Sequence, residues 1–280
     1  MKKEQLQEIT EKLENGVKNL LESDKYREYL AFLAKFHDYS FNNSLLILLQ
    51  YPSASFVAGF ETWKKKHNRY VRKGEKGIKI IAPSPIKIKV RNELDEQVEK
   101  EIPLYKAVTV FDVSQTEGAA HPSIRAQELT ADVENYNEFL AKLEKISPCQ
   151  IFFEKIGDGT KGYYSERENK IVINSGMSEL QTIKTLIHEI SHAMLHNSEE
   201  AKKRDKKPSR NAQEMEAESI AFTVLTYLGM DTSEYSFPYL VSWHGEDDLK
   251  EFKQSLEIIK DAAAKLINAI NGADAIGKAA

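Results

Sequence analysis

The sequence predicts an α+β protein of two domains. We expect N-terminal helices with a small antiparallel sheet, linked to a C-terminal domain in which a small sheet precedes long helices. Apolar residues recur at helical spacing over residues 3–37 and 178–228, and short alternating segments lie between them. Residues 1–110 carry 20 Lys and Arg against 15 Asp and Glu, and the remainder carries 19 against 28. This charge asymmetry predicts two parts with different partners.

The N-terminal domain is placed at residues 1–112. Its apolar stripes predict four helices, of which the third has Asn42 or Asn43 as a candidate N-cap and ends before Pro52. The fourth becomes basic at residues 64–66. The four cover residues 3–23, 25–37, 45–50 and 60–66.

Three strands are predicted after these helices. Gly74 and Gly77 mark a turn before the first strand, and the second strand alternates apolar residues with Lys and Arg. Residues 93–100 are interpreted as a charged hairpin tip or loop. The strands cover residues 78–82, 86–90 and 104–111.

Basic residues dominate the segment from Trp63 to Arg91, which holds 11 Lys and Arg and one acid, Glu75. Lysine and arginine attract phosphates through counterion release, and aromatic faces stack on unpaired bases. Since no helix-turn-helix or zinc-finger pattern is present, single strands fit better than duplex. The alternative is a lysine-decorated, solvated hairpin.

Residues 113–127 contain Gly118, Pro122 and several small residues, and are interpreted as a linker. The C-terminal domain then covers residues 128–280. It is predicted to start with a helix and three strands, to have a polar loop at residues 200–210, and to end with a helix over residues 247–270. The first helix and the strands cover residues 129–146, 150–156, 162–165 and 170–174.

The most informative motif is His188-Glu189-Ile190-Ser191-His192, which lies in an amphipathic helix over residues 178–196. Histidines four apart leave one side of a helix a turn apart, so both can bind one ion. Two imidazoles suit Zn²⁺, and Glu189 is placed to act as a general base without being a ligand. The alternative is a solvated helix face with two histidines that bind nothing.

A zinc site for hydrolysis needs a third protein ligand, and a second helix from Asn211 to Leu228 offers one. Glu214 and Glu218 are four apart on one face of this helix. We interpret Glu214 as the third ligand and Glu218 as a carboxylate that hydrogen-bonds a ligand histidine. Glu216 points away from this face and is expected to be solvated.

The rest of the composition favours a cytoplasmic protein. The single cysteine, Cys149, excludes an intramolecular disulfide and fits a reducing compartment. The N-terminus lacks the apolar segment of a signal peptide, and no apolar stretch approaches 18 residues. We therefore expect no membrane association.

Further segments of the chain carry a resemblance to a known family: Ser44–Ile47, Gln50–Pro52, Gly59–Trp63, Val71–Ile78 and Pro238–Trp243. Together with His188–His192 and Glu214, they resemble the ArdC-type antirestriction proteins. His188–His192 with Glu214 also resembles the ImmA/IrrE zinc peptidases, a gluzincin-like site in a zincin fold.

The resemblance implies a protein of a mobile element that binds incoming single-stranded DNA and protects it from restriction during conjugation. It implies DNA contacts at Trp63, Arg72, Lys73 and Lys76, and an unidentified protein substrate for the peptidase. An oxyanion donor is expected, with three candidates left open: Tyr163, Tyr164 and His196.

Two hypotheses about function follow, one an enzyme and one a binding protein. In the first, the chain is a DNA-tethered zinc endopeptidase, with Glu189 as the base. In the second, it is a single-stranded-DNA coat in which zinc is structural and no proteolysis is needed. A nuclease is less favoured because two His and one Glu provide no second metal site.

Overall fold

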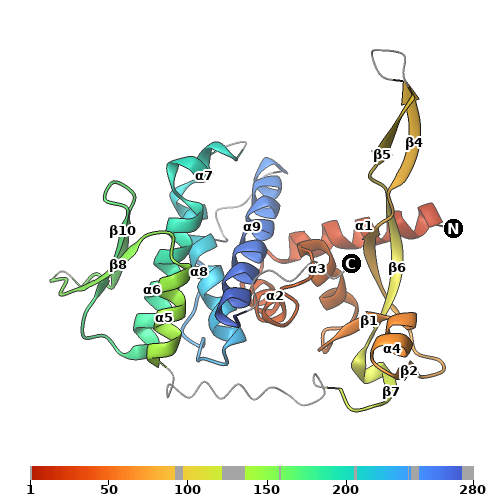
Figure 1. Cartoon of the computed structure of the whole chain (residues 1–280), viewed down its shortest axis with the longest axis horizontal. Coiled ribbons are helices and arrows are strands. Elements are labelled where there is room, and N and C mark those ends of the chain that lie inside the picture. The colour runs from red at the N-terminus through yellow and green to blue at the C-terminus, as the bar shows by residue number, and fades with distance from the viewer. Residues whose placement is uncertain are drawn as a thin grey trace. The chain divides into compact units, whose positions relative to one another are not determined.

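The computed structural model of the chain describes residues 2–91, 97–121, 136–157, 159–204, 207–238, 240 and 246–272. Helices are combined with small sheets (Figure 1), so the predicted α+β class is confirmed. The elements form two compact units. The first takes in the described parts of residues 1–18 and 42–127, and the second those of residues 19–41 and 128–279.

Three helices of the first unit are α1 (Lys2–Asn19), α3 (Phe41–Gln50) and α4 (Phe60–Lys66). The prediction that Asn42 or Asn43 caps the third helix is wrong, because α3 already begins at Phe41. The Asn43 side chain instead bonds strand backbone: its Nδ2 donates to the Ile81 carbonyl at 2.8 Å, and its Oδ1 accepts from the Ile81 amide at 2.9 Å.

The main sheet of the first unit is antiparallel, in the order β1-β6-β3. Gln50 bonds the same strand in the same way as Asn43. Its Oε1 accepts from the Lys79 amide at 3.0 Å, and its Nε2 donates to the Lys79 carbonyl at 2.8 Å. Helix α3 therefore satisfies backbone groups along β3, one of the two outer strands of this sheet. The three strands are β1 (Val57–Gly59), β6 (Tyr105–Asp112) and β3 (Ile78–Pro83).

A two-stranded ribbon extends from the ends of β3 and β6 (Figure 1), formed by β4 (Ile86–Arg91) and β5 (Gln97–Ile102). The interpretation of residues 93–100 as a tip or loop is wrong for residues 97–100, which form β5, and residues 92–96 lie outside the described residues. The partner of β4 is therefore β5, while β6 returns along β3. A short pair, β2 (Arg69–Val71) with β7 (Thr116–Gly118), completes the unit, after the 3-10 turn Val113–Gln115.

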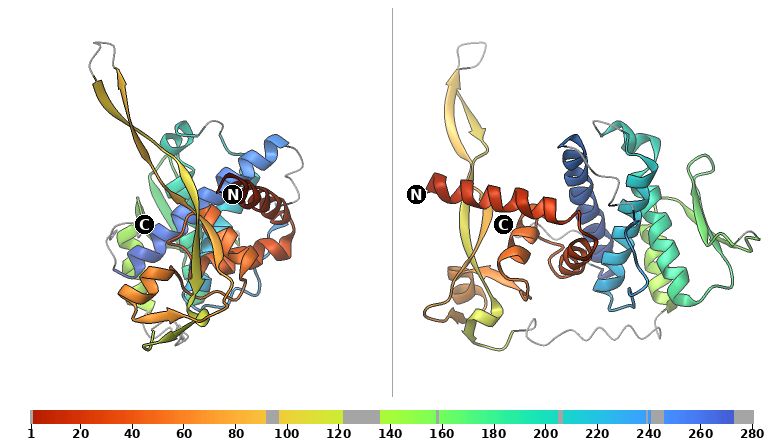
Figure 2. Two further views of the ribbon diagram at one scale, coloured as in Figure 1. Left: turned by 90° about the vertical axis from the view of Figure 1, so that its right-hand side faces the viewer. Right: turned by 180° about the vertical axis from the view of Figure 1, so that it is seen from behind.

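In the second unit, helix α8 (Arg210–Tyr227) packs against α2 (Ser23–Lys35), α6 (Glu179–Leu195) and α9 (Glu246–Ile270). Figures 1 and 2 show α8 between α6 and α9. The sequence interpretation assigned residues 19–41 to the first domain, whereas their contacts are with this unit.

The sheet of the second unit has the order β8-β10-β9. Its central strand β10 (Lys170–Asn174) is parallel to β8 (Gln150–Glu154) and antiparallel to β9 (Gly162–Ser165). The β10 residues Ile171–Ile173 are fully buried, as the near-continuous apolar run predicts. Helix α6 packs on β9 and β10 and is thereby held beside the sheet.

Two further helices belong to the second unit. Helix α5 (Tyr136–Ile146) is the described part of the helix expected over residues 129–146, whose start lies outside the described residues. Helix α7 (Ser198–Lys202) occupies part of the expected polar loop. Of the apolar segment near residue 240, Phe237 and Leu240 are buried, while residues 239 and 241–243 lie outside the described residues. Among the described residues no helix is long and apolar enough to cross a membrane.

Candidate metal centre

The two motif histidines lie on one face of α6. The helix is capped by Ser178, whose hydroxyl accepts from the Gln181 amide, and it runs to Leu195. His188 and His192 are one turn apart, with ring centroids 4.7 Å apart and their Nε2 atoms separated by 3.0 Å. Their facing nitrogens define a point that one ion could occupy.

Helix α8 brings Glu214 to the same point. Its Oε2 lies 3.5 Å from His188 Nε2 and 3.6 Å from His192 Nε2. Two tetrahedral ligands at zinc distances are about 3.3 Å apart, so the three separations fit a single small ion. Among the described residues, ligand atoms of His188, His192 and Glu214 all lie within 4.8 Å of one another.

The charge around this point is negative. The neighbouring His188 and His192 rings hold the pKa of the Glu214 carboxyl well below its ordinary range. Burial lowers the pKa of His188, but Glu214, Glu189 and Glu218 outweigh it and raise that pKa above its ordinary value. These carboxylates favour a cation at the cluster.

Glu189 is buried beside the histidines, with an exposed fraction of 8%. Burial is the main influence on its carboxyl and raises its pKa, although the two histidines and a hydrogen bond with the Tyr164 backbone act in the opposite direction. Such a carboxylate is positioned to accept a proton.

Glu218 and Glu216 differ from their predicted environments. Glu218 Oε1 faces His188 Nδ1 at 3.9 Å, which is longer than a hydrogen bond. The prediction that Glu216 is solvated is wrong: its side chain is 0% exposed and bonds His196 Nε2 at 2.9 Å. Helix α8 is packed on several sides, so the face opposite Glu214 is also interior.

His196 does not fit the expected role of oxyanion donor. Its Nδ1 lies 2.8 Å from His192 Nδ1 and its Nε2 bonds Glu216, so both ring nitrogens are engaged. Tyr163 and Tyr164 are adjacent on β9, and successive strand residues point to opposite faces. One of these two tyrosines therefore remains as the candidate.

The basic turn of the first unit lies between β2 and β3. Lys73 and Lys76 are exposed, and no described carboxylate lies within ion-pair distance of either. Arg72 instead donates to Glu75 Oε1 at 2.6 Å and to the Ser114 carbonyl at 2.7 Å, so it stabilises the turn.

Trp63 is buried and does not fit the DNA contact predicted for it. Its ring is 0% exposed, and its Nε1 donates to the Phe111 carbonyl at 2.9 Å. No face of the indole is available to stack on a base. The positive charge of β4 is also partly neutralised, because Lys87 and Lys89 lie opposite Glu101 and Glu99 in the ribbon and Lys87 Nζ lies 3.7 Å from Glu99 Oε2.

Two family models match the chain. The N-terminal domain of anti-restriction factor ArdC matches residues 1–111, and the IrrE N-terminal-like domain of peptidase family M78 matches residues 145–265. The chain joins an ArdC N-terminal domain to an IrrE-like domain. The resemblance drawn from the sequence is thereby confirmed.

Individual relatives agree with this family. The uncharacterized protein pXO2-81 of Bacillus anthracis is 30% identical over 309 residues, which cover 96% of the chain and 52% of that protein. The chain thus spans about half the length of this relative. The metal-free crystal structure of antirestriction ArdC protein from R388 plasmid has a TM-score of 0.54 at 21% identity, with 83% of each chain covered. Its Mn(II)-bound structure has a TM-score of 0.50 at 21% identity, with 85% of this chain and 86% of that chain covered. At this identity the ArdC structures show a shared fold.

Proposed function

We propose that the chain is a single-stranded-DNA-binding zinc metallopeptidase of a mobile element, which acts in antirestriction during conjugative transfer. The observation that supports this best is the cluster of His188, His192 and Glu214 around one point, with buried Glu189 beside it. A structural metal site has no need of a base at that position.

The donor set fits zinc. Two imidazole nitrogens and one carboxylate oxygen are ligands that Zn²⁺ accepts, and three protein ligands leave one position for chemistry. Mn(II) is bound by the related ArdC protein, and carboxylate ligands also suit that ion. Zinc, when bound, would polarise the scissile carbonyl of a peptide as a Lewis acid.

The residues of the chain supply the rest of the reaction. The Glu189 carboxylate takes the proton of the attacking water, and then donates it to the leaving amine. Burial of this carboxyl, which raises its pKa, strengthens its capacity to hold the proton between the two steps. Strand β9 is at the end of its sheet and packs on α6, so an extended peptide could pair along its outer edge.

The first unit supplies the DNA contacts in this proposal. Exposed Lys73 and Lys76 can each neutralise a phosphate. Arg72 is proposed to act indirectly, by fixing the turn that carries them. A protein bound to incoming DNA in the cytoplasm would meet proteins that act on the same DNA.

The test is Glu189→Gln, which keeps the side chain's volume and removes its basicity. We expect protection of transferred DNA to be lost, with zinc content and DNA binding unchanged, because loss of a general base costs about 10²–10⁴-fold in rate. Glu179→Gln, an exposed position in the first turn of α6, is the matched control. Unchanged protection in Glu189→Gln would support the non-proteolytic DNA coat instead.

A further inference from the structure

The ligand candidate His192 has a second ring nitrogen that faces away from the cluster. Its Nδ1 lies 2.8 Å from His196 Nδ1. Two imidazole nitrogens at this distance share one proton, so one ring donates and the other accepts. Which ring donates is decided by the partners of the two remaining nitrogens, His192 Nε2 and His196 Nε2.

One arrangement satisfies every contact. If His192 Nε2 binds the metal, as the proposed function requires, the His192 proton is on Nδ1 and is donated to His196 Nδ1. The proton of neutral His196 is then on Nε2, which lies 2.9 Å from Glu216 Oε2 and donates to it. The chain of bonds therefore runs from the metal ligand to a carboxylate.

Glu216 is held in place from two further segments. Arg204, just beyond α7, donates from Nη1 and Nη2 to the two carboxylate oxygens at 3.0 and 2.9 Å. Ser255 of α9 donates to Oε1 at 2.6 Å. A buried carboxylate with this many donors stays ionised and fixed, and can orient His196.

We propose that His196 and Glu216 are positioning residues that fix the tautomer and ring orientation of His192 for metal binding. This inference rests on the proposed function, because it takes His192 as a metal ligand. It assigns a role to two residues that lie outside the His188–His192 motif.

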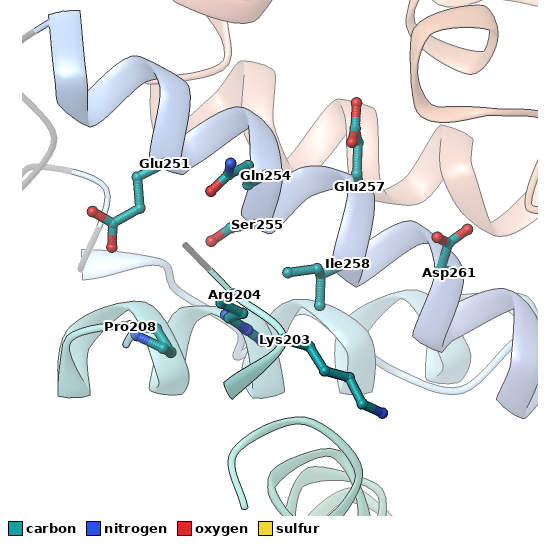
Figure 3. Close-up of a pocket in the computed structure, with 9 residues that line it drawn as sticks. All are labelled: Lys203, Arg204, Pro208, Glu251, Gln254, Ser255, Glu257, Ile258 and Asp261. Atoms are coloured by element: carbon teal, nitrogen blue, oxygen red, sulfur yellow. The ribbon is translucent and has the colours of Figure 1, made fainter. Parts of the chain in front are cut away.

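The far end of this contact chain reaches the surface. Arg204 and Ser255 line a pocket of about 270 Å³ between α9 and the segment that precedes α8 (Figure 3). Glu257 and Asp261, which also line the pocket, are exposed to solvent. Substitutions of Ser255 can therefore loosen Glu216 without entering the metal cluster.

The first measurement uses the wild-type full chain loaded with Zn²⁺. The chain has seven histidines, so nitrogen-15 labelling of histidine gives a readable NMR spectrum of ring tautomers. We expect His192 as the Nδ1–H form and His196 as the neutral Nε2–H form. A His196 proton on Nδ1 would overturn the proposal, and no variant has to fold for this result.

The second measurement is the zinc dissociation constant of metal-free variants, determined by competition with a chromophoric chelator. His196→Leu removes the acceptor, and we expect zinc binding about 10–100-fold weaker. His196→Asn keeps an oxygen near the Nδ1 position and should stay within a few-fold of wild type. Should His196→Leu fail to fold, Ser255→Ala, which should weaken binding measurably, replaces it.

The matched control is His37→Leu, at a buried histidine of the same unit whose Nδ1 contacts the Ala34 carbonyl. A purely structural role predicts equal zinc affinity for folded His196→Leu and wild type, which would refute the inference. If wild type itself shows no zinc binding that depends on His188, the proposed function fails first, so the two failures are distinguishable.

Discussion

Lys73 and Lys76 differ from Arg72 in whether their charge is paired within the protein. Both lysine side chains are exposed and without a described carboxylate partner, while the Arg72 guanidinium is bonded to Glu75 and to backbone. An exposed ammonium keeps its full attraction for phosphate, whereas a paired guanidinium is partly neutralised.

The double variant Lys73→Ala/Lys76→Ala should therefore weaken binding to a single-stranded oligonucleotide and make it less salt-dependent. The loss of two phosphate contacts is expected to lower the slope of log K against log salt by about 1.4. Fluorescence anisotropy across a salt series measures both quantities. Lys145→Ala/Lys265→Ala, two exposed lysines of the second unit, is the matched control, and equal slopes in the two double variants would contradict the assignment.

Spacing within one helix predicted which site residues share a face, but it could not predict their distant partners. His188, His192 and Glu214 converge as helical geometry implies. The burial of Glu216 was not predictable from spacing, because an amphipathic helix has one buried face whereas α8 packs against three helices. Its partners Arg204 and Ser255 come from other segments, and no local pattern connects them to it.

Helices and strands with strong periodicity were predictable, and elements built by pairing were not. Helix α6 and strand β10 follow from apolar spacing and from a continuous apolar run. Strand β5 reads Gln-Val-Glu-Lys-Glu-Ile and has little strand propensity of its own. It becomes a strand because β4 pairs with it, with Lys and Glu opposite one another.

Helix α2 provides a prediction at the scale of elements, because it packs on α8 although it lies far from it in sequence. Tyr26 bonds Ser219 at 2.7 Å, and Leu33 is fully buried. Leu33→Ala should cost about 2–5 kcal/mol of unfolding free energy in the second unit. The control Leu49→Ala in α3, where Leu49 is 38% exposed, should cost less.

Thermal unfolding with and without zinc locates the effect of Leu33→Ala. A ligand that binds only the folded state raises its stability by about 2.7 kcal/mol at a hundredfold excess over Kd. The transition that zinc shifts should therefore be the one that Leu33→Ala lowers. A lowered transition that does not respond to zinc would place α2 with the first unit instead.

At the scale of the whole molecule, the order of domains was visible in the charge asymmetry and in the motifs, and the family models match the two halves in that order. The placement of residues 19–41 with the second unit was not visible. Amphipathic spacing shows that a helix has a buried face, but not which helix will cover it.

The proposed metal centre holds one ion between three side chains, those of His188, His192 and Glu214. Native mass spectrometry of the full chain, purified metal-free and titrated with Zn²⁺, counts the ions held per chain. We expect one tightly bound ion in wild type, and none at the same zinc concentration in His188→Ala, His192→Ala or Glu214→Ala, with all three variants folded. A wild type that holds no zinc, or a Glu214→Ala variant that binds it as tightly as wild type, would contradict the proposed metal centre.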